Sequence, residues 1–83
     1  MTVLVTLEAF EQLEALPGTM RRRIRTIMER LRRWPAVSGA KPLTGGLAGQ
    51  YRIRTGDYRL QFHVRGNEVL VVKIGHRDGF YED

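Results

Sequence analysis

The sequence predicts an α+β domain in which two N-terminal helices pack on one face of a mainly antiparallel, four-stranded sheet. A short apolar run at residues 3–5 predicts the first strand, and two segments with helical periodicity follow it. The second half of the chain then alternates apolar and polar residues in three stretches joined by Gly-containing turns, which is typical of an antiparallel meander. The length of 83 residues fits a single domain, residues 1–83.

The first helix is expected at residues 7–15. Thr6 precedes it as a candidate N-cap, because its hydroxyl can accept a hydrogen bond from a free amide of the first turn. Pro17 and Gly18 end this segment, and Thr19 is the next candidate cap. Apolar residues at intervals of three are expected to form the packed stripe of the helix: Leu7, Phe10, Leu13 and Leu16.

The second helix, about residues 20–34, has the clearest periodicity. Its other positions are nearly all Arg or Glu, and Pro35 ends it. The stripe is therefore expected to pack on the sheet while the charged residues face outward. The apolar positions share one face of a helix with a period of about 3.6 residues: Met20, Ile24, Ile27, Met28, Leu31 and Trp34.

The rest of the chain is expected to form three strands. Residues 35–49 are rich in Pro and Gly and predict an irregular connection. The strands are expected at residues 50–55, 58–64 and 68–76. In the last strand, alternation predicts that the residues on the core face are Leu70, Val72, Ile74 and His76. The residues predicted on the opposite face are Val69, Val71, Lys73 and Gly75.

The composition excludes several kinds of chemistry. Without cysteine the chain has no disulfides, no thiolate nucleophile and no Cys-based zinc site. Two His residues supply few ligands for a metal centre, so neither a metal nor another cofactor is expected. No apolar run approaches the roughly 20 residues of a membrane span, and the N-terminus does not resemble a signal peptide. A cytoplasmic domain without membrane contacts is expected.

Positive charge is concentrated in the second helix and in the strands. The formal net charge is +5, and 12 of the 14 basic residues are Arg, whose planar fork suits phosphate groups. A polyanion or an acidic protein is therefore the expected partner. For the seven Arg of the helix, a solvated outer face explains the pattern equally well.

Strand alternation also predicts a cationic surface on the sheet face opposite the helices. The residues expected there are Arg52, Arg54, Arg59, Gln61, His63 and Lys73. Arg77, at the end of the last strand, shares the parity of Lys73. Crowded guanidinium groups repel one another, so a bound anion would reduce this electrostatic repulsion. The same groups could stabilise the charge that develops on a phosphate during nucleophilic attack. His76 has core parity, but a bulge or the strand end could turn it outward as a candidate proton donor.

Several short motifs, in order and spacing, resemble the RelE/ParE toxin family of bacterial toxin–antitoxin systems. They are residues 41–54 (KPLTGGLAGQYRIR), 56–60 (GDYRL), 74–77 (IGHR) and Tyr81. Residues 13–17 (LEALP), the Arg-rich helix and Pro35 are also similar to that family. The family fold, two helices on a mainly antiparallel sheet, agrees with the prediction above.

The resemblance implies a function and a set of partners. The RelE branch contains ribosome-dependent messenger-RNA endonucleases, in which the ribose 2′-hydroxyl attacks the adjacent phosphate without a metal. By resemblance the catalytic residues are Arg52, Arg54, Arg59, Arg77 and Tyr81. The basic residues expected to contact RNA or the ribosome are Arg21, Arg22, Arg25, Arg32, Arg33, Lys41 and Lys73. A small acidic antitoxin, forming a hetero-oligomer with the toxin, is the implied protein partner, beside messenger RNA and the ribosome.

The sequence departs from the best-known RelE pattern at two positions. Arg52 and Arg54 stand where that pattern has Lys, and Arg is not deprotonated in proteins, so neither is expected to act as a simple general base. Two alternatives stay open. The ParE branch shares the scaffold and inhibits DNA gyrase without catalysis, and a relative that has lost activity would retain only basic RNA binding.

Overall fold

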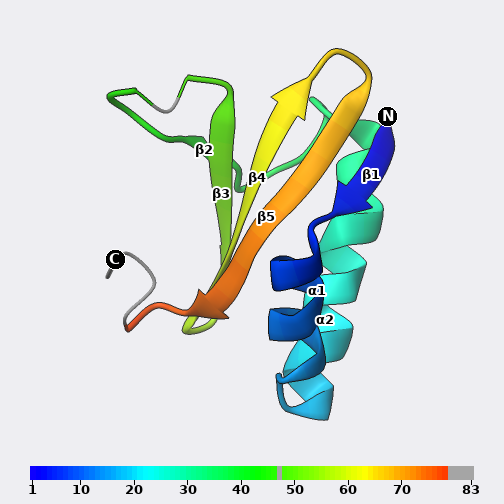
Figure 1. Ribbon diagram of the computed structural model, residues 1–83, viewed down its shortest axis with the longest axis vertical. Coiled ribbons are helices and arrows are strands. Elements are labelled where there is room, and N and C mark those ends of the chain that lie inside the picture. The colour runs from blue at the N-terminus through cyan, green and yellow to red at the C-terminus, as the bar shows by residue number, and fades with distance from the viewer. Residues whose placement is uncertain (47, 79–83) are drawn as a thin grey trace.

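Two helices cover one face of a five-stranded sheet (Figure 1). The structure is a computed structural model and describes residues 1–46 and 48–78. The elements are β1 (Thr2–Val5), α1 (Leu7–Glu14), α2 (Gly18–Arg30), the 3₁₀ turn η1 (Leu31–Arg33), β2 (Lys41–Pro42), β3 (Gln50–Thr55), β4 (Tyr58–Arg65) and β5 (Glu68–His76). This arrangement confirms the predicted α+β class with both helices on one sheet face. None of the described helices is long and apolar enough to cross a membrane.

The sheet has the strand order β1-β5-β4-β3-β2. β1 runs parallel to β5, and the other neighbours are antiparallel. The prediction of four strands is one short, because β2 lies within the connection expected to be irregular and pairs Lys41 with Arg52 and Pro42 with Tyr51. A two-residue strand is too short to show an alternation. Its position at the sheet edge suits Pro42, which has no N–H to donate.

A β-bulge interrupts the pairing of β4 with β5. Gln61 lies opposite Lys73, but the next residue, Phe62, lies opposite Val71. Val72 is therefore the extra residue on β5 and has no partner in the ladder. An extra residue of this kind shifts the alternation of side chains along the strand that carries it.

The bulge corrects the predicted faces of β5. Val69 and Val71 are fully buried in the core, whereas Leu70 lies opposite His63 on the other face. Placing Leu70 and Val72 on the core face was wrong, because the prediction carried one uninterrupted alternation from the C-terminal half of the strand through the bulge.

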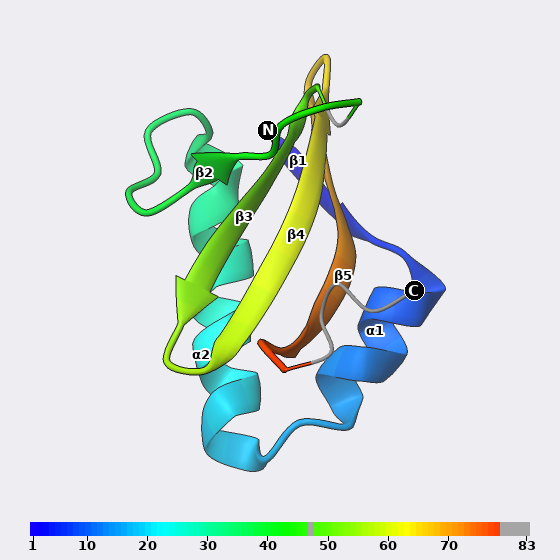
Figure 2. The same cartoon turned by 90° about the vertical axis from the view of Figure 1, so that its left-hand side faces the viewer.

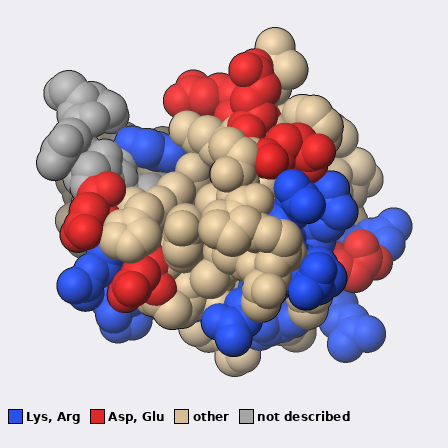
Figure 3. All heavy atoms as spheres, turned by 90° about the horizontal axis from the view of Figure 1, so that it is seen from below, with Lys and Arg blue, Asp and Glu red and all other residues tan. Residues whose placement is uncertain are grey.

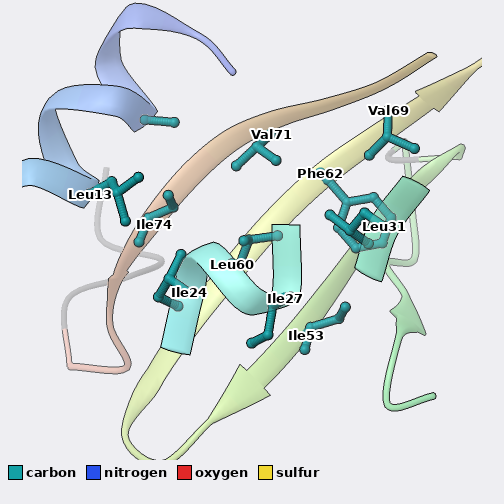
Figure 4. Packing of buried hydrophobic residues seen from close by; sticks show 11 residues of the cluster. Leu13, Ile24, Ile27, Leu31, Ile53, Leu60, Phe62, Val69, Val71 and Ile74 are labelled. Atoms are coloured by element: carbon teal, nitrogen blue, oxygen red, sulfur yellow. The ribbon is translucent and has the colours of Figure 1, made fainter. Parts of the chain in front are cut away.

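The helical stripe of α2 and η1 forms the centre of the core (Figure 4). Ile24, Ile27 and Leu31 are buried and point toward the sheet, where Leu60 and Phe62 are fully buried. Met20, Met28 and Trp34 are partly buried against this cluster, so the predicted stripe is confirmed throughout. The 3₁₀ turn continues the helix far enough to bury Leu31.

The first helix packs through only part of the predicted stripe, since Leu13 is buried and Leu16 packs against the core. Thr6 caps it as expected, since its hydroxyl accepts from the Ala9 N–H at 3.1 Å. Ala9 and Leu13, four residues apart, are buried, but Leu7 is 73% exposed and Phe10 is 46% exposed. Steps of three residues drift around the helix, so only part of such a series can face the sheet. Thr19 is not a cap, because α2 starts at Gly18.

A side chain of α1 completes the edge of β5 where β1 ends. The Thr6 N–H donates to the Val71 carbonyl at 3.0 Å, at the end of the β1–β5 pairing. Beyond it, the Ile74 N–H donates to Oε1 of Gln12 at 2.8 Å. Gln12 is half-buried, so this amide acceptor replaces the neighbour that β1 no longer supplies.

Replacing Gln12 by Met should lower the free energy of unfolding by about 1–3 kcal/mol, because a partly buried Ile74 N–H loses its acceptor. Chemical denaturation measures the change. Gln12→Glu is the matched control, since it keeps an oxygen at the same reach and should lose less stability. If the Met variant is as stable as the original chain, water satisfies this amide and the contact is dispensable.

Candidate functional site

The sheet face that the helices leave uncovered, here called the open face, is seen in Figure 2. Directly opposed residues of an antiparallel ladder project to the same face. The register places Lys41 opposite Arg52, Arg52 opposite Gln61, and Gln61 opposite Lys73. These four residues form one polar row across β2, β3, β4 and β5. The prediction that Arg52, Gln61 and Lys73 share this face is confirmed, and β2 adds Lys41 to them.

A second row lies nearer the β3–β4 turn. Arg54 is directly opposite Arg59, and Arg59 is opposite Gly75. The Cβ atoms of opposed residues lie about 4.5–5.5 Å apart, so the two Arg side chains start side by side on the open face. Gly75 has no side chain and leaves room above the row. The turn is formed by Gly56 at a φ of 58°, which a residue with a side chain rarely adopts.

Arg77 continues this second row past the end of β5. Its backbone N–H donates to the carbonyl of Asp57 at 2.6 Å, which fixes it beside the β3–β4 turn. Its side chain is 60% exposed, and Nε lies 3.8 Å from a carboxylate oxygen of Asp78. The register therefore brings Arg54, Arg59 and Arg77 to one end of the sheet, as the sequence predicts.

Arg52 carries an unusual donor. Its Nη1 atom is buried and has no hydrogen-bond partner among the described residues. A buried unsatisfied donor costs about 1–3 kcal/mol, so such groups are uncommon and occur at functional sites. An anionic ligand that reached the polar row containing Arg52 would supply the missing acceptor.

His76 has the helix-side parity that the sequence predicts, since it lies opposite Tyr58 and two residues from buried Ile74. At the strand end, however, it is not packed: its side chain is 42% exposed and its ring lies edge-on to Tyr58 at 5.2 Å. Nδ1 accepts from the Asp78 N–H at 3.1 Å, which leaves the proton of the neutral ring on Nε2.

Asp78 is a site residue that the sequence reasoning missed. Its carboxylate lies 3.5 Å from Nδ1 of His76 and 3.8 Å from Nε of Arg77. Its position directly after these two residues was the available signal. The predicted residue Tyr81 lies outside the described residues. Within residues 1–46 and 48–78, no group of three or more acidic or His side chains could hold a metal ion.

Most of the predicted RNA-binding residues lie on α2 and η1, and α2 covers the sheet face opposite the open face (Figure 1). Two of them are neutralised: Arg25 lies 3.0 Å from Glu14, and Arg32 lies 2.6 Å from Glu29. Figure 3 shows Lys and Arg mainly along the right and lower rim and acidic residues gathered at the top, with acidic and basic groups side by side at the left. In the described part of the chain, the other predicted RNA-binding residues of this region form no ion pair: Arg21, Arg22 and Arg33.

Comparisons with known proteins agree with this architecture. The family model for the ParE toxin of the type II toxin–antitoxin system parDE matches residues 3–79. Toxin RelE3 of Methanocaldococcus jannaschii is 29% identical over 85 residues, covering 99% of this chain and 97% of the relative.

Solved structures show the same fold. The RelBE2 toxin–antitoxin complex of Mycobacterium tuberculosis contains a chain 30% identical, with a TM-score of 0.79, covering 92% of this chain and 96% of that one. The RelB–RelE antitoxin–toxin complex of Methanococcus jannaschii contains a chain 27% identical, also with a TM-score of 0.79 and with 95% of each chain covered.

Proposed function

Since the chain belongs to the RelE/ParE toxin family of type II toxin–antitoxin systems, we propose that it is a ribosome-dependent messenger-RNA endonuclease. The observation that carries the proposal is the second row of the open face. It holds Arg54, Arg59 and Arg77 at one end of a rigid sheet. His76 has helix-side parity, but at the strand end its exposed ring and Arg77 both lie near the Asp78 carboxylate. Cations positioned on strands can stabilise the charge that develops on a phosphate under attack.

The proposed reaction needs no metal. The ribose 2′-hydroxyl gives up its proton to water while its oxygen attacks the neighbouring phosphorus. The bond from phosphorus to the 5′-oxygen breaks, a cyclic phosphate forms, and the leaving 5′-oxygen takes up a proton. Arg59 and Arg77 stabilise the equatorial oxygens of the phosphorus, because a guanidinium fork donates two parallel hydrogen bonds. Arg52 and Arg54 hold the flanking backbone, with one of them near the 2′-oxygen. Tyr81 positions a nucleotide.

His76 is the proposed proton donor to the leaving oxygen. The ring is exposed, carries a proton on Nε2 when neutral, and can take up a second proton on Nδ1 beside the Asp78 carboxylate. His is suited to proton transfer near neutral pH, whereas the Arg residues of the site are not.

His76→Gln should therefore slow cleavage by about 10²–10⁴-fold, the usual contribution of a positioned acid or base. Single-turnover cleavage of messenger RNA on programmed ribosomes measures the rate, and thermal unfolding serves as the control. A stability loss with cleavage retained would assign His76 to packing against Tyr58 instead.

The proposed protein partner is a small acidic antitoxin. Two of the solved relatives are toxin–antitoxin complexes, and the net charge of +5 favours an acidic partner here. A disordered acidic segment could wrap over the open face and order on binding, giving a hetero-oligomer in the cytoplasm. High-level expression of the chain without a partner and without growth arrest would contradict an active toxin.

Induction of the chain in cells tests the proposed reaction directly. Mapping of transcript 5′ ends should show cuts within codons that are being translated, before DNA synthesis changes. The appearance of such cuts with purified ribosomes would separate direct cleavage from cellular nucleases acting later.

A second candidate function is inhibition of DNA gyrase by protein binding. The matching family model is that of the ParE toxin, which favours this alternative. In that case DNA replication should stop first, transcripts should stay intact, and substitutions of the second row should act on gyrase binding and not on RNA cleavage.

A further inference from the structure

A hollow of about 350 Å³ lies between α2 and the edge of β3, beside the open face. Three Arg residues line it, Arg23 and Arg30 from α2 and Arg54 from β3. The hydroxyl-bearing residues around it are Thr26, Ser38 and Thr55. The lining thus offers three Arg residues and the hydroxyls of Ser38 and Thr55 as hydrogen-bond donors, whereas the Thr26 hydroxyl already donates to the Arg22 carbonyl.

The guanidinium groups come from different sides. Arg30 donates from Nη2 to both the Oγ and the carbonyl of Ser38, at 3.0 and 3.4 Å, which holds it at the loop after η1. Nη1 of Arg23 lies 4.0 Å from the point where a Cβ on Gly56 would sit, so it lies against the β3–β4 turn. Arg54 reaches the hollow from the strand between them.

None of the described carboxylates neutralises this cluster. No Asp or Glu lines the hollow, and none of the described acids forms an ion pair with Arg23, Arg30 or Arg54. By contrast, Arg25 of α2 and Arg32 of η1 are each paired with a Glu. Among the described residues, Arg23 and Arg30 therefore leave uncompensated positive charge at the hollow.

Within residues 1–46 and 48–78, the edge of β3 has no partner strand at this place. β2 pairs only with Tyr51 and Arg52, and no other described strand pairs with this edge. The Gln50 carbonyl accepts from Leu43 on the β2 side, and backbone groups alternate between the two edges of a strand. The N–H of Arg54 therefore points past the end of β2, toward the same edge.

We propose that this hollow binds a phosphate group of the RNA backbone, at a site next to the one where the strand is cut. The inference rests on the proposed function, because Arg54 belongs both to the second row of the open face and to the hollow. An RNA strand lying on the open face can continue over the β3 edge and place its next phosphates against α2. Donors from three directions suit a tetrahedral phosphate, whereas one guanidinium fork already satisfies a planar carboxylate.

The test compares two variants with the same change of net charge. Arg23→Gln with Arg30→Gln removes two walls of the hollow and leaves Arg54 in place. Arg65→Glu is the control, because it lowers the net charge by the same amount at an exposed residue at the far end of β4. The probe is a short single-stranded RNA with methylated 2′-hydroxyls, which cannot be cleaved by 2′-attack, and its dissociation constant is measured over a series of KCl concentrations.

The first variant should bind the probe at least about ten-fold more weakly at low salt. The slope of log K against log salt should fall by about 0.7, the value for one lost phosphate contact on a single strand. The second variant should keep the slope of the original chain. Equal slopes in both variants, or no binding of the probe by the original chain, would overturn the inference.

Further combinations of results distinguish the phosphate site from the proposed function and from binding of an acidic protein. If the original chain binds the probe as expected but does not cut messenger RNA on ribosomes, the proposed function fails and the phosphate site stands. If cutting occurs but the first variant keeps the original slope, the site fails alone. Loss of antitoxin binding with an unchanged RNA slope would assign the hollow to an acidic protein and also overturn it. Both substituted residues are exposed, so thermal unfolding should change little.

Discussion

Replacing Arg77 by Ala should lower the rate of messenger-RNA cleavage by about 10²–10³-fold, the usual effect of removing one preorganised donor to a developing charge. The fold should persist, because the side chain is 60% exposed and its ordering contact, the hydrogen bond to Asp57, is made by the backbone N–H. Single-turnover cleavage on programmed ribosomes, with growth after induction as a second readout, measures the loss.

Arg77→Lys and Arg65→Ala are the controls for this prediction. Lys keeps the charge but not the planar fork, so partial activity is expected. Arg65 is an exposed Arg in the same sheet, opposite Glu68 at the far end of β4, and its loss should leave cleavage unchanged. Full toxicity of both Arg59→Ala and Arg77→Ala would contradict the endonuclease proposal and bring gyrase inhibition forward.

The fold was predictable wherever a local pattern and the packing agree. α2 has an apolar stripe with a helical period, and Ile24, Ile27 and Leu31 are buried as expected. β4 alternates without interruption over its buried residues, so Leu60 and Phe62 face the core. In these elements each residue's own preference and the tertiary contacts select the same structure.

The sequence-based predictions are wrong where a segment distant along the chain determines the local structure. The bulge at Val72 depends on how β4 pairs with β5, and the sequence of β5 alone is compatible with an unbroken alternation. α1 has two apolar residues that the sheet does not cover, Leu7 and Phe10, because its burial depends on the position of β5. The pairing of β2 with β3 depends on a connection whose path no periodicity describes.

In the candidate site too, local features could be predicted and contacts between distant segments could not. Arg52, Arg54 and Arg59 could be assigned to one face because strand parity is a local property. To predict that Lys41 lies opposite Arg52, one needs the register of β2. To predict the hollow around Arg23 and Arg30, one needs the distance between a helix and a strand edge. Neither relation is carried by spacing along the chain.

An aromatic cluster joins the helix layer to the sheet beneath the open face. The ring of Phe62 lies edge-on to Trp34 at 5.3 Å and stacked on Tyr51 at 5.6 Å, and Trp34 lies 4.6 Å from Tyr51. Phe62 is fully buried, and it follows Gln61, where the register of β4 and β5 shifts. The cluster therefore supports both the core and the bulge that determines which side chains of β5 reach the open face.

Phe62→Ala should lower the free energy of unfolding by about 3–5 kcal/mol, because it removes a fully buried ring and leaves a cavity. Small domains have only about 5–15 kcal/mol in total, so a large share of the stability is lost. Denaturant unfolding followed by Trp34 fluorescence measures it. Leu7→Ala removes an apolar side chain that is 73% exposed and should change stability by no more than about 0.5 kcal/mol. If the two variants unfold at the same denaturant concentration, the aromatic cluster does not hold the sheet to α2, and the rigid placement proposed for the open face loses its physical basis.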